Sequence, residues 1–261
     1  MKSSTLRYLL PAIAFLATQL IAGFLMGVVG LIFNLNPSEP ILLTVTMLLS
    51  FLLAFAYCYW GLKAIRLPEC FQHHAPSLPV CFIAIVAVMT GSLASNILCE
   101  QLNLTDIIAD QMIRMATNPL GMLTIGLIGP VVEELVFREA TLGTMLRNGV
   151  TPWATMITSA LIFGIVHLNP AQVPFAAIMG LMLAIVYYCT GNIVLTSLLH
   201  IINNSVAVVQ INLLGEEAKE FTLTQWLGGI TNSWLVFAFC ALACLALLIV
   251  FWRKSQTPSF D

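Results

Sequence analysis

The sequence predicts an all-α, polytopic membrane protein, a helical bundle of about eight transmembrane helices. Two observations of composition predict this fold class: 59% of the 261 residues are hydrophobic, and only 8% are charged. Soluble domains carry about 25% charged residues, so a chain of this length could not cover its surface in water. The third observation is that apolar runs near the ~20 residues needed to cross a bilayer recur along the whole chain.

Eight expected spans follow one another in order. They cover residues 9–33, 41–62, 79–99, 120–146, 152–169, 171–190, 192–213 and 232–252. The first span follows Lys2 and Arg7, and its apolar run is longer than the core of a cleavable signal peptide, so we expect a retained first helix. Spans five to seven are joined by very short turns at Asn169-Pro170 and Gly191-Asn192.

Charge placement predicts the topology. Eight of the ten Lys and Arg residues fall on the side of the membrane that carries both chain ends. Basic residues accumulate on the cytoplasmic side of membrane proteins. We therefore expect both termini in the cytoplasm and the chain in a bacterial inner membrane.

The chain divides into three expected parts. Residues 1–118 supply N-terminal transmembrane helices with an amphipathic outer segment, and residues 119–213 supply a catalytic transmembrane core. Residues 214–261 supply an outer loop, the last transmembrane helix and a cytoplasmic tail. The seven cysteines form no CxxC pair, so neither a disulfide framework nor a thiolate metal site is indicated. The lipid bilayer is an expected partner and a nucleic acid is not.

The fourth span contains two adjacent acids, Glu133 and Glu134, with Arg138 one helical turn later. A charge at bilayer depth costs roughly 2.5–3.5 kcal/mol on insertion scales, so it usually marks function. Glu134 and Arg138 are spaced i,i+4 and are expected to pair. Glu133 points about 100° away and is left as a candidate general base. Pro130 predicts a kink just before the acids.

Two later spans each carry one imidazole. His167 shares a helical face with Phe163, and His200 shares a face with Asn204. A carboxylate and an imidazole can together take a proton from water, while a second imidazole and an amide can stabilise an oxyanion. This set of groups predicts amide hydrolysis by water without a covalent intermediate.

The same residue types also suit a metal ion. Glu133, His167 and His200 are of the kinds that bind catalytic zinc. No HExxH motif supports zinc, and the chemistry of the side chains leaves the two alternatives nearly balanced.

Three motifs in order resemble the signature of the CPBP family, which comprises CAAX prenyl proteases and bacteriocin-processing or immunity proteins and is also called the Abi family. The motifs cover residues 133–204, and they read Glu133-Glu134-x-x-x-Arg138, Phe163-x-x-x-His167 and His200-x-x-x-Asn204. One departure is Glu139, which stands where many relatives carry Gly.

The resemblance implies an intramembrane endopeptidase acting on a peptide or a membrane protein. By the family pattern, Glu133 and His167 would activate water, and His200 with Asn204 would form the oxyanion hole. Glu134, Arg138 and Phe163 would support these four residues. No cofactor is favoured, with a divalent metal such as zinc as the alternative.

Two other functions compete with this interpretation. A non-catalytic bacteriocin-immunity or membrane scaffold protein of the same fold would be favoured by loss of a catalytic residue, yet all are present. A proton-coupled transporter would also use buried acids and histidines. Transporters usually show repeated halves, whereas the polar residues here cluster in spans four to seven only.

Overall fold

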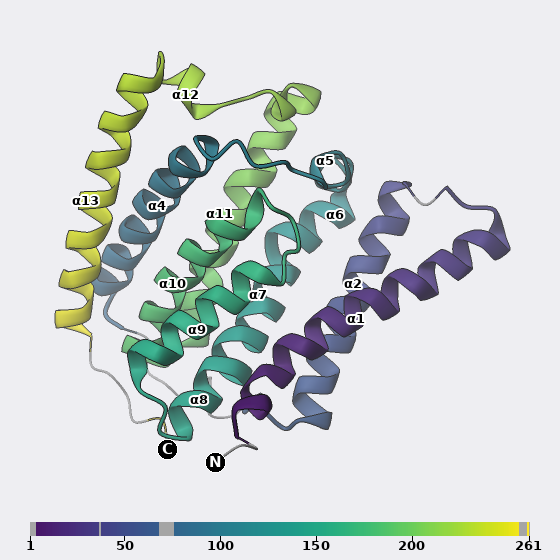
Figure 1. The fold of residues 1–261 in the computed structure, drawn as a ribbon, viewed down its shortest axis with the longest axis horizontal. Helices are drawn as coiled ribbons and strands as arrows, with labels where there is room; N and C mark the ends of the chain where they lie inside the picture. Colours follow the sequence, from purple (N-terminus) through teal and green to yellow (C-terminus); the bar gives the residue numbers. More distant parts are fainter. Residues whose placement is uncertain (1–3, 37, 68–75, 256–259, 261) are drawn as a thin grey trace. The chain divides into compact units, whose positions relative to one another are not determined.

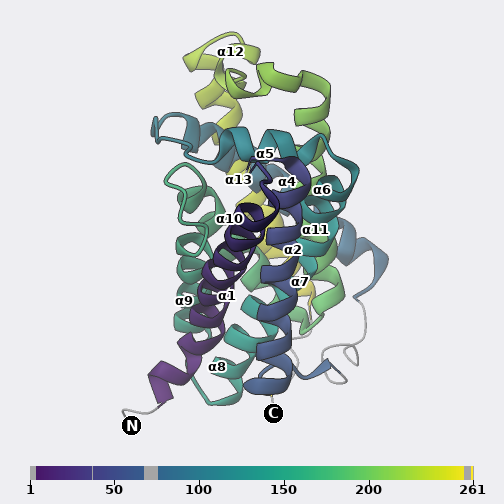
Figure 2. The ribbon, with the colours of Figure 1, turned by 90° about the vertical axis from the view of Figure 1, so that its right-hand side faces the viewer.

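The computed structural model describes residues 4–36, 38–67, 76–255 and 260 (Figures 1 and 2). Every regular element in these ranges is helical, and the described residues form no strand. The all-α prediction is therefore confirmed.

Seven helices among the described residues are long and apolar enough to cross a membrane. They are Arg7–Phe33, Pro40–Gly61, Leu78–Glu100, Pro119–Arg147, Gln172–Thr190, Ile193–Lys219 and Ile230–Lys254. The remaining expected span, residues 152–169, coincides with α9 (Pro152–Ile165), which is apolar but has only 14 residues. The chain is thus an integral membrane protein built as a polytopic helical bundle.

The chain forms two compact units, and each is assembled from three separate segments. The first unit comprises Met1–Leu67, Ile108–Met145 and His200–Lys219, and the second comprises Pro68–Ile107, Leu146–Leu199 and Glu220–Asp261. Both units therefore draw on early and late parts of the sequence. The expected three consecutive parts, 1–118, 119–213 and 214–261, stay a prediction.

In the first unit, α1 (Ser4–Phe33) packs along α2 (Pro40–Ala56), as Figure 1 shows. The π-helical turn η1 (Tyr57–Gly61) continues α2. Three aromatic rings tie these helices together: the Phe15 centroid lies 5.9 Å from that of Phe51 and 5.1 Å from that of Phe137. Phe137 belongs to the helix that carries the acids, so this aromatic contact holds that helix against α1.

The fourth span of the chain is a composite helix. Its parts are α6 (Pro119–Leu123), η2 (Thr124–Ile128), α7 (Gly129–Glu134), η3 (Leu135–Gly143) and α8 (Thr144–Arg147), and both η2 and η3 are π-helical. Asn118 caps its start, because its side-chain oxygen accepts from the Leu120 N–H at 3.0 Å. π-Helical turns are rare and frequent at functional sites. Two of them flank the short α-helical segment that ends in Glu133 and Glu134.

The rest of the first unit is α5 (Ala109–Ala116), the second part of α11 (Ile193–Leu214) and η4 (Gly215–Lys219). Its small apolar core gathers buried side chains from α5, η2 and α11, namely Met115, Ala116, Ile125 and Val208.

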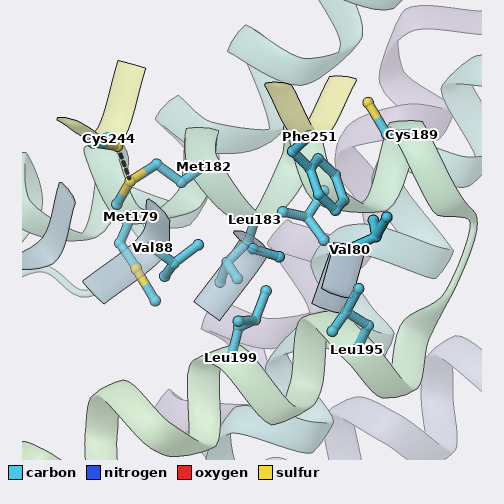
Figure 3. Packing of buried hydrophobic residues seen from close by; sticks show 12 residues of the cluster. Val80, Val88, Met179, Met182, Leu183, Cys189, Leu195, Leu199, Cys244 and Phe251 are labelled. Atoms are coloured by element: carbon cyan, nitrogen blue, oxygen red, sulfur yellow. Dashed lines mark hydrogen bonds between the residues drawn. The ribbon is translucent and has the colours of Figure 1, made fainter. Parts of the chain in front are cut away.

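In the second unit, α4 (Leu78–Glu100) packs along α13 (Ile230–Lys254) and α10 (Gln172–Thr190) packs against α9. A short helix, α12 (Leu223–Trp226), precedes α13. Figure 3 shows the core of this unit, to which α4, α10, α11 and α13 contribute. There the Cys244 thiol donates to the Met182 sulfur at 3.6 Å.

Candidate functional site

The first unit brings four charged or titratable side chains together, which we name the acid–histidine cluster: Glu133, Glu134, Arg138 and His200. Arg138 Nε lies 3.1 Å from Glu134 Oε2, so the pair expected from the i,i+4 spacing is present. The other oxygen of Glu134 lies 3.1 Å from His200 Nδ1. His200 Nε2 lies 3.7 Å from Glu133 Oε2. The imidazole of α11 therefore sits between the two adjacent carboxylates of α7.

The acid–histidine cluster is shielded from solvent. The side chains of Glu134 and Arg138 are 0% exposed and that of His200 is 5% exposed. Glu133 is the most accessible of the four, at 12%. Buried charges are tolerated where they are paired and hydrogen-bonded. Glu134 and Arg138 are paired with each other, and Glu134 also contacts His200, whereas Glu133 is the more exposed of the two carboxylates.

The contacts of His200 determine which nitrogen carries a hydrogen. An ionised carboxylate can only accept, so Nδ1 is the donor toward Glu134 and carries the hydrogen. In the neutral ring, Nε2 is then an acceptor; in the imidazolium, Nε2 also donates.

Asn204 lies one turn after His200 on α11 and contacts the composite helix. The Gly129 N–H donates to Thr124 O, five residues back, so the next donor in that register would be the N–H of Pro130 to Ile125 O. Proline has no N–H, which leaves the Ile125 carbonyl without its helical donor. The Asn204 side-chain amide donates to this carbonyl at 3.1 Å. The kink predicted at Pro130 stays a prediction. The structure has a π-helical register just before Pro130, and the Asn204 amide replaces the missing backbone donor to the Ile125 carbonyl.

His167 belongs to the second unit and lies in the turn that follows α9. The expectation that it lies within a helix spanning 152–169 is wrong, because α9 ends at Ile165. Leu168 adopts φ 52°, a left-handed conformation that a continuing α-helix does not allow. His167 Nδ1 lies 2.8 Å from the Phe163 carbonyl oxygen, and the Phe163 ring meets the imidazole edge-on with centroids 5.0 Å apart. Since a carbonyl only accepts, Nδ1 carries the hydrogen and Nε2 is the acceptor of the neutral ring.

Close packing of α9 on α10 supports this turn. A Cβ added at Gly164 would lie 2.7 Å from the Val173 carbonyl oxygen and 2.9 Å from Ala177 Cβ, so a larger residue would displace α10. Gly164 therefore lets α10 approach α9 at the residue three positions before His167.

The expected site residues thus fall into two groups. Within the first unit the structure gathers the acid–histidine cluster and places Asn204 on the same helix as His200. Phe163 and His167 meet each other in the second unit. The joint action of Glu133 and His167 on water stays a prediction. Within the residues that the structure describes, no group of three or more His, Cys, Asp or Glu side chains is arranged to hold a metal ion.

Sequence reasoning did not identify two polar residues beside His167. The sequence predicts Asn169 only as part of a turn with Pro170, and nothing in the expected 1–118 part distinguishes Asp106. Asn169 is 0% exposed and donates to Asp106 across 63 positions of sequence. An Asn directly before Pro marks a turn, and the turn alone carries no signal for a partner so far away.

Comparisons with known proteins agree with the three motifs. Residues 115–206 match the family model described as "Type II CAAX prenyl endopeptidase Rce1-like". YdiL of Bacillus subtilis (strain 168), which carries a provisional description as a membrane peptidase, is 30% identical over 91 residues, covering 35% of this chain and 37% of that protein. The membrane-embedded CAAX protease MroQ of Staphylococcus aureus (strain USA300) is 28% identical over 105 residues, covering 38% of this chain and 42% of that protein.

The matched region is the part of the chain that carries the motifs. The chain spans less than half the length of these curated relatives. No solved structure matches it. The resemblance to the CPBP family expected from the motifs is confirmed by the family model and by both relatives.

Proposed function

We propose that this chain is an intramembrane endopeptidase, which hydrolyses a peptide bond in a peptide or membrane protein presented at the bilayer. The single observation that carries the proposal is the position of His200 between Glu133 and Glu134 in a buried cluster. Such an arrangement offers a carboxylate, a polarised imidazole and a shielded environment, in which electrostatic effects on a reacting group are strong. The match of residues 115–206 to a CAAX endopeptidase family supports the same reaction class.

In the proposed reaction, water is the nucleophile. Glu133 and His167 take its proton, and the hydroxide oxygen forms a bond to the carbonyl carbon of the substrate. The negative charge moves to the carbonyl oxygen, where His200, as the imidazolium that carries a hydrogen on Nε2 as well as on Nδ1, and the Asn204 amide donate to it. The carbon–nitrogen bond then breaks, the carbonyl re-forms as a carboxylic acid, and the proton that Glu133 and His167 took from water passes to the leaving amine.

The contacts described above suit these roles. Glu134 accepts from His200 Nδ1, which directs Nε2 toward Glu133, and Arg138 compensates the charge of Glu134. The Phe163 carbonyl engages His167 Nδ1, which leaves Nε2 as the atom able to accept a proton. Asn204 gives one N–H to the Ile125 carbonyl, and an amide group has a second N–H for the oxyanion.

The metal-free reaction is the form we propose, with zinc held by Glu133, His167 and His200 as the alternative. We further propose that both termini face the cytoplasm and that the membrane is a bacterial inner membrane. These proposals rest on the absence of a zinc motif in the sequence and on the placement of its basic residues.

The test is cleavage of a peptide library by the purified chain reconstituted in liposomes, with and without a chelator. Glu133→Gln keeps the size of the side chain and removes the base, so we expect the cleavage rate to fall on the order of 10²–10⁴-fold. Glu217→Gln removes an acid from an exposed position of η4 and serves as the matched control, with the wild-type rate expected.

Each outcome of this experiment decides between stated alternatives. Wild-type cleavage by Glu133→Gln would overturn the assignment of the base. Loss of cleavage with chelator would move Glu133, His167 and His200 into a metal shell. A wild-type protein that binds peptides from the library and cleaves none would support the non-catalytic immunity or scaffold function instead.

A further inference from the structure

The turn after His167 has a backbone that requires support. Leu168 adopts φ 52°, and a bulky residue in the left-handed region is uncommon and costs free energy. Such conformations persist where the surrounding structure holds them in place, and they occur most often at functional sites. Leu168 directly follows His167, so whatever holds Leu168 also determines where the imidazole points.

Asn169 supplies that support with both ends of its side chain. Its amide nitrogen donates to Asp106 Oδ1 at 2.9 Å, and its amide oxygen accepts from the Ile107 N–H at 3.1 Å. The side chain is 0% exposed. Residues 106 and 107 lie between α4 and α5, so Asn169 binds the turn to a segment far from it in sequence.

The backbone of Asn169 adds a second connection. Its carbonyl accepts from the N–H groups of Gln172 at 2.9 Å and Val173 at 3.0 Å, which begins α10. On the other side of His167, the His167 N–H donates to Gly164 O at 3.2 Å and the Leu168 N–H donates to Ile165 O at 3.1 Å. One residue therefore joins the end of α9, the start of α10 and the 106–107 segment.

We propose that Asn169 and Asp106 are positioning residues for His167: their hydrogen bond holds the left-handed turn at Leu168 and so keeps Nδ1 of the imidazole on the Phe163 carbonyl. The inference rests on the proposed function, in which His167 Nε2 accepts the proton of the attacking water. Neither Asn169 nor Asp106 is given a contact with substrate. A misplacement of about 1 Å at a catalytic group can cost about 10²-fold in rate, which is the size of effect such residues control.

The chemistry of the pair offers a reciprocal test. Asn169 must donate to Asp106 and accept from the Ile107 N–H, and an amide side chain does both. Asn169→Asp keeps the acceptor and replaces the donor by a second carboxylate oxygen facing Asp106. Asp106→Asn keeps an acceptor for Asn169. The double variant restores one donor and one acceptor with their roles exchanged.

The first readout is kinetic. We expect Asn169→Asp to lower kcat about 10–100-fold with KM unchanged within about twofold, because the substrate contacts remain and the proton acceptor is displaced. We expect Asp106→Asn to stay within about threefold of wild type, and the double variant to recover to the same range. A double variant as slow as Asn169→Asp would overturn the proposal.

The second readout does not depend on activity. In ¹⁵N-histidine NMR of the full chain in detergent micelles, with His167 assigned through His167→Gln, we expect the Nδ1–H tautomer in wild type. Asn169→Asp should shift His167 toward a mixture of tautomers, and the double variant should return it. An unchanged His167 spectrum in Asn169→Asp would overturn the positioning role even if the chain cleaves nothing, and an inactive wild type with the expected spectra would place the failure in the proposed function instead.

A control variant separates positioning from general loss of structure. Glu100 is another polar connection of the second unit, accepting from the Leu223 N–H at 2.6 Å and the Thr224 N–H at 3.0 Å. Glu100→Gln weakens this connection far from His167 in sequence. We expect it to lower the melting temperature while leaving kcat and the His167 spectrum unchanged. A His167 shift in Glu100→Gln equal to that in Asn169→Asp would show that any destabilisation moves the ring, and would overturn the proposal.

Discussion

Two imidazoles that the structure describes, His200 and His167, are held in opposite ways. In the acid–histidine cluster, His200 of α11 is held by two carboxylates of the composite helix, and one of these, Glu134, is paired with the Arg138 guanidinium of the same helix. In the turn after α9, His167 is held by the backbone carbonyl and the aromatic ring of Phe163, which lies in α9, and the turn itself is held by hydrogen bonds of Asn169. In the sequence, both histidines are predicted by an i,i+4 spacing, His167 from Phe163 and His200 to Asn204.

This difference between the two histidines predicts which property a substitution changes, the stability of the fold or the orientation of the ring. A buried ionic group left without its partner is costly, so the cluster couples activity to folding. A histidine held by a backbone carbonyl can be removed without leaving a buried charge, so substitutions in the turn should change activity through the orientation of the ring alone.

Arg138→Ala should have the largest effect on stability. It leaves the fully buried Glu134 without its cation, which costs about 3–5 kcal/mol for a buried pair with one partner removed. The measurement is the unfolding free energy in detergent. Glu134→Gln in the Arg138→Ala background should recover part of the loss, and Arg253→Ala at an exposed position should change little. Undiminished stability of Arg138→Ala would show that the pair is not needed for folding.

His200→Ala and His167→Ala test the contrast directly. Both should lower the cleavage rate on the order of 10²–10³-fold, because each group acts on the reacting atoms. His200→Ala should also cost about 1–3 kcal/mol in unfolding free energy, since Glu134 loses a buried donor. His167→Ala should cost less than about 1 kcal/mol, because the Phe163 carbonyl lies within a helix that water can reach through the vacated space. Equal losses of stability in the two variants would remove the distinction between the regions.

Asn204→Ala tests the gap at Pro130. Without the side chain, the Ile125 carbonyl loses its donor, which costs about 1–3 kcal/mol for a buried group left unsatisfied. Pro130→Ala supplies a backbone N–H at the position where the helix lacks one. In a double-mutant cycle the Asn204→Ala loss should therefore be smaller in the Pro130→Ala background. Strictly additive losses would indicate that Asn204 and Pro130 do not act on the same carbonyl.

The smallest effect is expected at an exposed ion pair between Asp110 and Lys219, the last residue of the Ile193–Lys219 helix. Lys219 Nζ lies 2.7 Å from Asp110 Oδ1, and the hydrogen bond and charge of Lys219 lower the pKa of Asp110. A lowered pKa in the folded state means that any stabilisation is present above the ordinary Asp pKa and is lost as pH falls through the lower, folded value. Because both groups are exposed and screened by salt, Asp110→Asn should leave the melting temperature unchanged near neutral pH. A clear fall in the melting temperature of Asp110→Asn would show that this ion pair stabilises the fold as a buried pair does.

Sequence patterns predict contacts between residues that are near in sequence well and contacts between residues that are far apart in sequence poorly. Helical spacing predicts the Glu134–Arg138 pair, and apolar length predicts the spans, because both depend on neighbouring residues. The contact of His200 with Glu134 joins residues 66 positions apart, and that of Asn204 with Ile125 joins residues 79 apart. Periodicity carries no signal for such pairings, and the π-helical register that exposes the Ile125 carbonyl depends on tertiary packing.

The end of α9 shows the same limit at shorter range. The apolar run continues to Leu168, so hydropathy predicts a helix as far as 169, whereas the helix ends at Ile165. The left-handed Leu168 is stabilised by Asn169 and Asp106, whose contact no local pattern reveals. The motif therefore predicts His167 as a candidate site residue, whereas its position in a turn is not predicted.

The spacing of Arg138 from Glu134 has a consequence for the synthesis of the chain. Arg138 is made four residues after Glu134, and His200 is made 66 residues after it. At about 5–20 residues per second, the ribosome needs roughly 3–13 s after Glu134 to synthesise the chain as far as His200. During that interval the nascent helix already carries its own counter-charge, so its entry into the lipid phase does not have to await the last member of the cluster.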